Sequence, residues 1–186
     1  ELLPDEPAYR SDQLAEWLYH HPVLSTDEMT NLPQSLRDTI APSLWPFEQV
    51  VEQVGDNGTT IKWLFRCTDG SQIETVLMGY ANRTTLCISS QVGCAMGCSF
   101  CDSGQCGFNR HLEAGEIVAQ VEYANAYLST APLPQSPGRV TNVVFMGMGE
   151  PLDNYRRTRE SIRQRVEVMG ISARSITVST VGFVPG

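Results

Sequence analysis

Apolar residues near the start of the chain recur with the spacing of an amphipathic helix. Leu14 and Trp17 fall on one helix face, and Ser11 is placed to cap that helix. Pro33 suits the first turn of a second helix, because a first turn leaves its N–H groups unbonded in any case. The pattern therefore predicts a small helical domain over residues 1–46.

Further along, the pattern changes to β-rich runs separated by short turns that contain Gly, Asn or Asp. Runs joined in this way are typical of an antiparallel meander. We expect such a meander over residues 47–90, with strands at Phe47–Val54, Thr59–Cys67, Gln72–Met78 and Thr84–Ser89.

A third pattern begins at residue 91 with a loop rich in Gly, Cys and Ser that runs to residue 111. Helices and buried-type strands then alternate, which predicts an α/β fold with a parallel sheet over residues 91–186. The expected elements are a helix over 113–128, a strand over 140–146, an arginine-rich helix over 153–168 and a strand over 175–180.

Composition narrows the class of protein. The 186 residues are 41% hydrophobic, enough to bury a core, and no run approaches the roughly 18 apolar residues of a membrane span. A net charge of −8 argues weakly against nucleic-acid binding through this chain alone, because phosphate contacts need basic surface. No signal peptide is visible at the start. Since the chain begins at Glu1 and stops at Gly186 just after an apolar run, we interpret it as a piece of a longer protein.

The chain carries 6 cysteines, most of them crowded into one stretch. A secreted disulfide scaffold is a weak interpretation, because the chain is long, has a core and lacks a secretion signal. Crowded cysteines in a reducing compartment more often bind metal or take part in catalysis. The six are Cys67, Cys87, Cys94, Cys98, Cys101 and Cys106.

Three of them form a C-x3-C-x2-C pattern on the loop: Cys94, Cys98 and Cys101. Thiolates are soft ligands that suit iron–sulfur clusters or zinc. Structural zinc sites usually take four protein ligands, whereas three close cysteines would leave one iron of a four-iron cluster open. A zinc knuckle completed by Cys106 remains the alternative.

The cysteine pattern, with Phe100 before its last member, resembles the radical S-adenosylmethionine superfamily. Longer motifs around it resemble the RlmN family of 23S rRNA adenine-C2 methyltransferases; they lie at residues 85–94, 107–110, 147–152 and 178–180. The resemblance implies a partial radical-SAM (βα)6-type barrel, about half present. Residues 1–46 would then be a helical accessory domain associated with RNA, residues 47–90 a β-meander, and residues 91–186 the first part of the core.

The resemblance also implies cofactors. The three cysteines would ligate a [4Fe–4S] cluster whose open iron chelates S-adenosylmethionine (SAM), and one electron would cleave SAM to a 5′-deoxyadenosyl radical. Gly149 and Glu150 match the family's glycine–glutamate motif, in which the carboxylate pairs with the cosubstrate's ammonium group. Ser179 matches another SAM-contacting position. The alternatives are an ordinary turn with a solvated Glu150 and a strand-end serine that caps a turn.

Two further residues acquire catalytic roles by the resemblance. Cys87 matches the family's resolving cysteine, which forms a disulfide with a methyl-carrying cysteine expected beyond Gly186. Glu74 matches the family's proton acceptor. Taken alone, a strand cysteine is usually a small buried hydrophobe, and Glu74 suits the solvent face of an alternating strand. Cys67 we interpret as packing.

The implied activity is methylation of C2 of adenine in 23S rRNA and certain tRNAs through a methyl-cysteine intermediate, supported by a reducing electron donor protein. A monomer in the cytoplasm with no membrane association is expected, and this segment alone is expected to be inactive. The rivals are a Cfr-like adenine-C8 methyltransferase and a zinc-binding RNA module.

Arginine side chains are candidates for contact with RNA phosphates. Arg110 and His111 lie at the end of the loop over residues 91–111, and the later helix is rich in arginine. Spacings such as Arg163 to Glu167 instead favour a solvated outer helix face for most of that helix. Its arginines are Arg156, Arg157, Arg159, Arg163 and Arg165.

Overall fold

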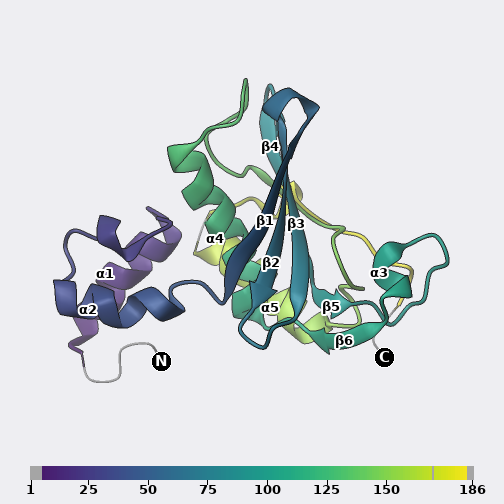
Figure 1. Ribbon diagram of the computed structural model, residues 1–186, viewed down its shortest axis with the longest axis horizontal. Coiled ribbons are helices and arrows are strands. Elements are labelled where there is room, and N and C mark those ends of the chain that lie inside the picture. The colour runs from purple at the N-terminus through teal and green to yellow at the C-terminus, as the bar shows by residue number, and fades with distance from the viewer. Residues whose placement is uncertain (1–5, 169, 184–186) are drawn as a thin grey trace.

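The computed structural model describes residues 6–168 and 170–183 (Figure 1). At its N-terminal end, helices α1 (Ala8–Tyr19) and α2 (Gln34–Ile40) pack around a small hydrophobic cluster of their own. The predicted helices are confirmed, but the predicted cap is wrong. Helix α1 begins at Ala8 after Pro7, because nothing in the intervening residues breaks a helix, and Ser11 lies inside it.

The main body is built on one six-stranded sheet with the order β1-β2-β3-β4-β7-β8. The first four strands pair antiparallel and the last two join in parallel, so the predicted meander and the parallel unit share a single sheet. The strands are β1 (Phe47–Gly55), β2 (Thr60–Cys67), β3 (Gln72–Tyr80), β4 (Arg83–Cys87), β7 (Asn142–Phe145) and β8 (Ile176–Val178).

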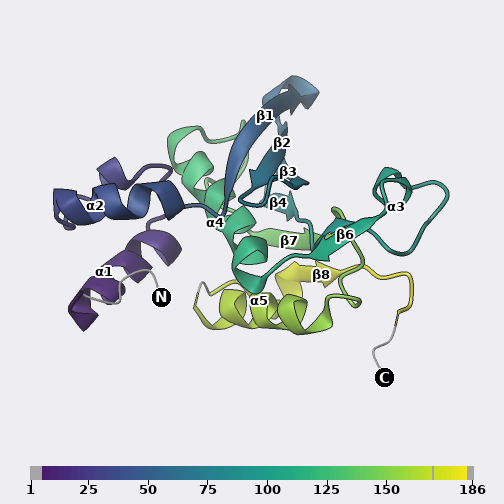
Figure 2. The same cartoon turned by 60° about the horizontal axis from the view of Figure 1, so that its bottom comes forward.

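One face of this sheet is covered by helix α4 (Ala114–Thr130), against which helix α5 (Tyr155–Glu167) lies (Figure 2). Alternate strand residues such as Trp63, Ile73 and Leu86 are fully buried there with Ile117. Alternation in the strands and a helical period in α4 together produce this core, which confirms the predicted elements.

The opposite face of the sheet carries the residues that alternate with this core. The register pairs Leu64 with Glu74 and Val76 with Cys87, so these side chains share that second face. Beside one end of it stand a small ladder of β5 (Gln91–Gly93) and β6 (Phe108–His111) and the short helix α3 (Asp102–Gln105). These three elements lie in the stretch predicted to be a loop; they are too short to leave a periodic signal.

Candidate functional site

Residues 94–107 form the cysteine loop, whose two ends are joined by the paired strands β5 and β6. This two-stranded ladder is the neck of the loop. Cys94 N–H donates to Gly107 O at 3.1 Å and closes the neck. Gly93 has a φ of +72°, and a Cβ there would lie 1.8 Å from Gly107 O, so only glycine fits. Within the loop, Cys101 N–H donates to Cys98 O at 3.1 Å, which turns the chain back between two of the three cysteines.

All three loop cysteines are free thiols that are partly buried. Burial raises the pKa of the Cys94 thiol, a backbone hydrogen bond at Met96 opposes this, and negative charge on Cys101, Cys98 and Glu150 adds to the rise. The three thiols and Glu150 therefore share one electrostatic neighbourhood. Within the described residues, no group of three or more His, Cys, Asp or Glu side chains is gathered closely enough to hold a single metal ion.

The loop after β7 lies directly against the segment that follows β4. A Cβ on Gly147 would come within 2.7 Å of the Ile88 carbonyl carbon. Gly149 has a φ of +101°, and a Cβ there would lie 2.5 Å from Gln91 Cβ. Both glycines are therefore required by close backbone approach, which places this loop at the root of the cysteine loop.

Glu150 is only 3% exposed, so the alternative of a solvated glutamate at this position is wrong. Its carboxylate accepts the Leu152 N–H at 2.9 Å and the Val181 N–H at 2.9 Å. Each oxygen retains a free lone pair for a cationic partner. Ser179 lies exposed at the exit of β8, close in sequence to Val181.

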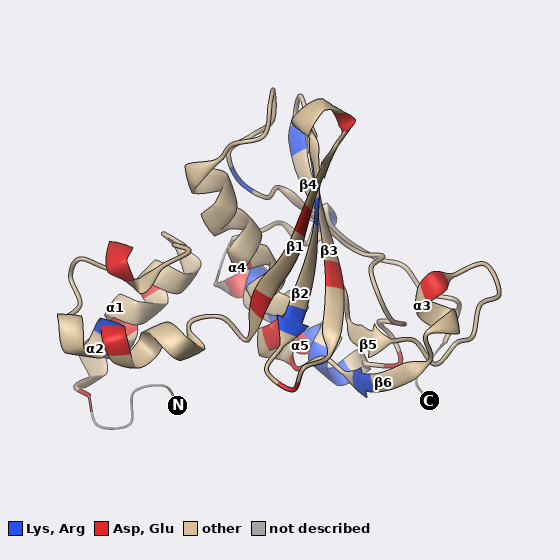
Figure 3. Cartoon of the chain, in the orientation of Figure 1, with Lys and Arg blue, Asp and Glu red and all other residues tan. Residues whose placement is uncertain are grey.

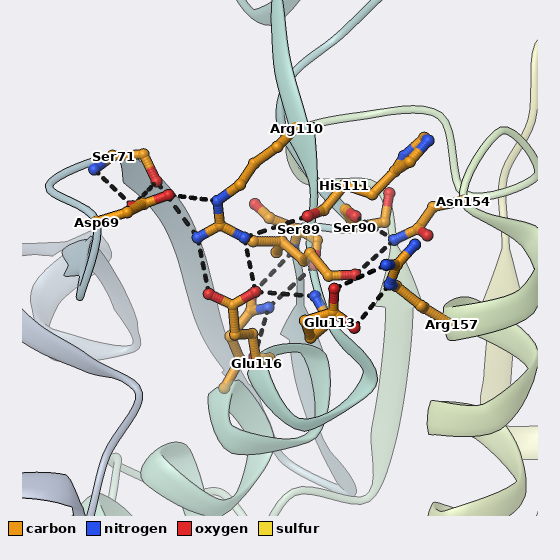
Figure 4. Close-up of polar contacts among 12 residues, drawn as sticks. Asp69, Ser71, Ser89, Ser90, Arg110, His111, Glu113, Glu116, Asn154 and Arg157 are labelled. Atoms are coloured by element: carbon orange, nitrogen blue, oxygen red, sulfur yellow. Dashed lines mark hydrogen bonds and ion pairs between the residues drawn. The ribbon is translucent and has the colours of Figure 1, made fainter.

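Buried polar side chains that sequence reasoning missed hold these loops together. Ser89 Oγ donates to Glu74 O at 2.6 Å and accepts the Met148 N–H at 3.0 Å. Asn154 Nδ2 donates to Ser90 O and Leu112 O, both at 2.8 Å (Figure 4). Ser89 lies in a family-like motif, which was its only signal in the sequence, and Asn154 gave none, because each bond joins residues far apart in the chain.

Glu74 lines a cavity of about 390 Å³ between the second face of the sheet and the cysteine loop. The Lys62 ammonium lies 2.6 Å from its carboxylate. Asp102, Cys106 and Met148 line the same cavity, so the structure brings Glu74 close to the loop.

Cys87 sits on the same face of the sheet as Glu74, one strand further along and opposite Val76. It is partly buried and is not among the residues that line the Glu74 cavity. Burial raises the pKa of its thiol, against a smaller opposite effect of a backbone hydrogen bond at Met146. Cys67 is buried in the core, as predicted.

Arg110 is held by two carboxylates (Figure 4). Its Nη1 and Nη2 donate to the Glu116 carboxylate, both at 2.8 Å, and its Nε donates to Asp69. Glu116 foremost raises the pKa of Arg110, and Arg110 foremost lowers the pKa of Asp69. Arg110 thus ties β6 to helix α4 and to the β2–β3 turn. The Nε, Nη1 and Nη2 atoms of its guanidinium group already donate to acceptors within the protein.

Basic residues gather around α5 and β6 (Figure 3), but they face different surroundings. Arg163 pairs with Glu167 on the helix surface, as predicted, and Arg157 pairs with Glu113 of the neighbouring helix start. Arg165 is fully buried and donates to the carbonyl oxygens of Ile117 and Val118. The solvated face predicted for most of these arginines is confirmed by the exposed Arg156, Arg159 and Arg163. Arg165 is the exception, because α4 covers that side of α5.

Comparisons with known proteins agree with this geometry. The family model of the radical SAM superfamily matches residues 88–186, and that of the ribosomal RNA large subunit methyltransferase N-terminal domain matches residues 4–44. A crystal structure of a radical SAM methyltransferase from Sphaerobacter thermophilus superposes with a TM-score of 0.85 at 48% identity. The superposition covers 95% of this chain and 52% of the Sphaerobacter chain. The chain therefore belongs to the radical SAM superfamily, and the expected α/β fold is confirmed.

Curated relatives of the chain indicate which family within the superfamily it resembles. A probable dual-specificity RNA methyltransferase RlmN from Bifidobacterium adolescentis is 50% identical over 97% of this chain and 48% of its own length. The protein of that name from Chloroflexus aurantiacus is 48% identical over 97% of this chain and 49% of its own length. These matches confirm the resemblance to the RlmN family. The chain spans about half the length of the relatives it matches.

Superfamily membership implies a [4Fe–4S] cluster and SAM. The donor set fits the cluster, because three cysteines lie on one loop whose tight backbone uses Gly93 and Gly97, and their thiolates are soft ligands. Fe–S clusters bind such thiolates through separate irons. The buried Glu150 carboxylate beside them fits an ammonium-bearing cosubstrate. Among the described residues, no helix has the length and apolar character that crossing a bilayer requires.

Proposed function

We propose that this chain supplies the N-terminal and central part of a radical SAM enzyme that methylates C2 of adenine in 23S rRNA and in certain tRNAs. The observation that carries the proposal is a convergence of three features. The cysteine loop, the buried Glu150 and the cavity lined by Glu74 meet where strands β4 and β7 end. Sites of α/β proteins usually lie at such carboxyl ends.

In this proposal Cys94, Cys98 and Cys101 hold the cluster, and Gly149, Glu150 and Ser179 contact SAM. The cluster would supply an open iron that binds SAM and the electron that cleaves it. Gly149 lets the backbone approach closely, and Glu150 offers its carboxylate to the cosubstrate ammonium.

Two residues of the second sheet face act on the substrate. Glu74 accepts the proton from the adenine carbon that receives the methyl group, using the carboxylate that faces Lys62. Cys87 resolves the methyl-cysteine adduct: its thiolate attacks the sulfur of a cysteine outside this chain, the bond from that sulfur to the transferred carbon breaks, and that carbon takes up a proton to become the methyl group. Burial raises the pKa of this thiol, and since the thiolate is the nucleophile, Cys87 must lose its proton before it attacks.

The decisive experiment is mass spectrometry of adenosines from 23S rRNA and tRNA of cells with and without the complete gene. Loss of 2-methyladenosine on deletion and its return on complementation support the proposal. Loss of 8-methyladenosine instead would assign the Cfr-like activity. A colourless purified protein with stoichiometric zinc and unchanged RNA would assign the zinc-binding module. We also expect a cytoplasmic monomer that draws electrons from a reducing donor protein.

A further inference from the structure

Gln91 is a fully buried side chain at the root of the cysteine loop. Its Oε1 accepts the Glu150 N–H at 2.8 Å, and its Nε2 donates to Asp153 Oδ2 at 2.8 Å. The partners determine this orientation of the amide, because an N–H can only donate and a carboxylate can only accept. The side chain thus joins β5 to two points of the loop after β7.

A third partner comes from β6. Gln91 Nε2 lies 3.0 Å from His111 Nδ1. One hydrogen of the amide points to Asp153, so the second is left for His111, whose Nδ1 must then be the acceptor and whose ring proton is on Nε2. Both strands of the neck are therefore bonded through one side chain to the loop that carries Glu150.

The backbone of Gln91 strengthens this link. Its N–H donates to Met148 O at 3.2 Å, and its Cβ is packed against Gly149 so closely that no side chain fits there. Glu150 is consequently held from two sides: Gln91 binds its N–H, while Leu152 and Val181 bind its carboxylate. Removing the Gln91 amide would leave the buried Glu150 N–H without a partner.

We propose that Gln91 is a positioning residue that sets Glu150 relative to Cys94 and its loop, and thereby determines the affinity for SAM. This inference rests on the proposed function, in which the loop holds the cluster and Glu150 meets the cosubstrate. Gln91 acts through its hydrogen-bond partners. Its influence passes through the Glu150 backbone and through Asp153.

The test uses the full-length protein after anaerobic reconstitution, with iron content, melting temperature and the dissociation constant for SAM measured for each variant. Gln91→Leu keeps the volume and removes the amide, and it is expected to weaken SAM binding about tenfold or more. Iron content should be unchanged, because the three thiols are intact. The control is Thr84→Val, which removes another fully buried hydrogen-bonding side chain, one that donates to Pro137 O near the start of β4. It should lower the melting temperature without changing SAM affinity.

A rescue pair separates the hydrogen bond from general packing. Gln91→Glu places a carboxylate against Asp153 and should also weaken SAM binding. Adding Asp153→Asn supplies a donor in place of the lost one, and the double variant should regain most of the affinity. The comparison of the double variant with Gln91→Glu also tests the inference if Gln91→Leu does not fold.

Parental SAM affinity in Gln91→Leu or Gln91→Glu, with iron bound, would overturn the inference and leave the proposed function standing. A double variant as weak as Gln91→Glu would overturn it as well. A parent protein that binds neither iron nor SAM would overturn the proposed function itself.

Discussion

The Lys62 ammonium lies 2.6 Å from the Glu74 carboxylate, diagonally across the β2–β3 pair. Their side chains are 41% and 42% exposed and line the cavity beside the cysteine loop. An ion pair this accessible to solvent is screened and weak, so it can open when a substrate enters. Glu74 is therefore a carboxylate that is held in place yet available.

Replacing Glu74 tests its part in the reaction. Glu74→Gln in the full-length protein is expected to lower the rate of RNA methylation about 100-fold or more, because an amide cannot accept the proton. Iron content and SAM binding should be unaffected. Glu48→Gln is the matched control, since it removes another exposed strand glutamate, paired with Arg66. Equal single-turnover rates for the two variants would show that Glu74 is not the proton acceptor.

The loop cysteines make separate predictions from Cys106. Cys94→Ala, Cys98→Ala and Cys101→Ala should each abolish cluster assembly, whereas Cys106→Ala should retain about four irons per chain. The reason is that Cys106 lies exposed beyond helix α3, at the edge of the Glu74 cavity. Iron and sulfide analysis after reconstitution is the measurement. Loss of the metal in Cys106→Ala, with zinc in the parent, would favour the zinc knuckle.

Gly149 is predicted to be indispensable for two reasons that can be separated. Gly149→Ala must adopt a φ of +101° and must also place its Cβ 2.5 Å from Gln91 Cβ. Gly70→Ala, with a φ of +84° and nothing within 4 Å, meets only the first difficulty, which costs roughly 1–2 kcal/mol. We expect Gly149→Ala to lower the melting temperature more and to weaken SAM binding. Equal melting temperatures would show that the contact with Gln91 is not tight.

Periodicity made most of the fold predictable. In β3, Ile73, Thr75 and Leu77 are fully buried while Glu74 between them is not, and that alternation is visible in the sequence. The β5–β6 ladder was not predicted, because strands of three and four residues are too short to show an alternating pattern. The start of α1 escaped because Pro7 shows a helix start as well as Ser11 does, and propensity alone cannot choose.

The candidate site was predictable as a set of residues but not as an arrangement. Nothing in the sequence near Glu150 indicates that Val181 donates to its carboxylate, or that Gln91 binds its N–H. Arg165 shows the same limit, because its neighbours along α5 cannot reveal that α4 covers it. Such contacts follow from tertiary packing, which a local sequence pattern does not reveal.

Two buried ionisable side chains, Glu122 of α4 and Arg165 of α5, carry the last prediction. Glu122 is 3% exposed and Arg165 fully buried. Burial raises the pKa of Glu122 to about 8, although the charge of Arg165 opposes this, and burial lowers the pKa of Arg165 to about 10. From pH 4.5, the ordinary value for a glutamate, to about 8, the folded protein thus keeps a proton that the unfolded chain releases. Stability contributed by this group therefore falls as pH rises through that window.

Glu122→Gln removes the titration while keeping the shape of the side chain. The full-length variant is expected to melt several degrees above the parent at pH 8, with a difference that shrinks toward pH 5, because only the parent must hold its carboxyl protonated when folded. Thermal melts between pH 5 and pH 8 measure this, with exposed Glu28→Gln as control. A variant that melts below the parent at pH 8 would mean that Glu122 is ionised in the folded protein and stabilises Arg165 as its counter-ion, since a buried guanidinium without a partner is strongly destabilising.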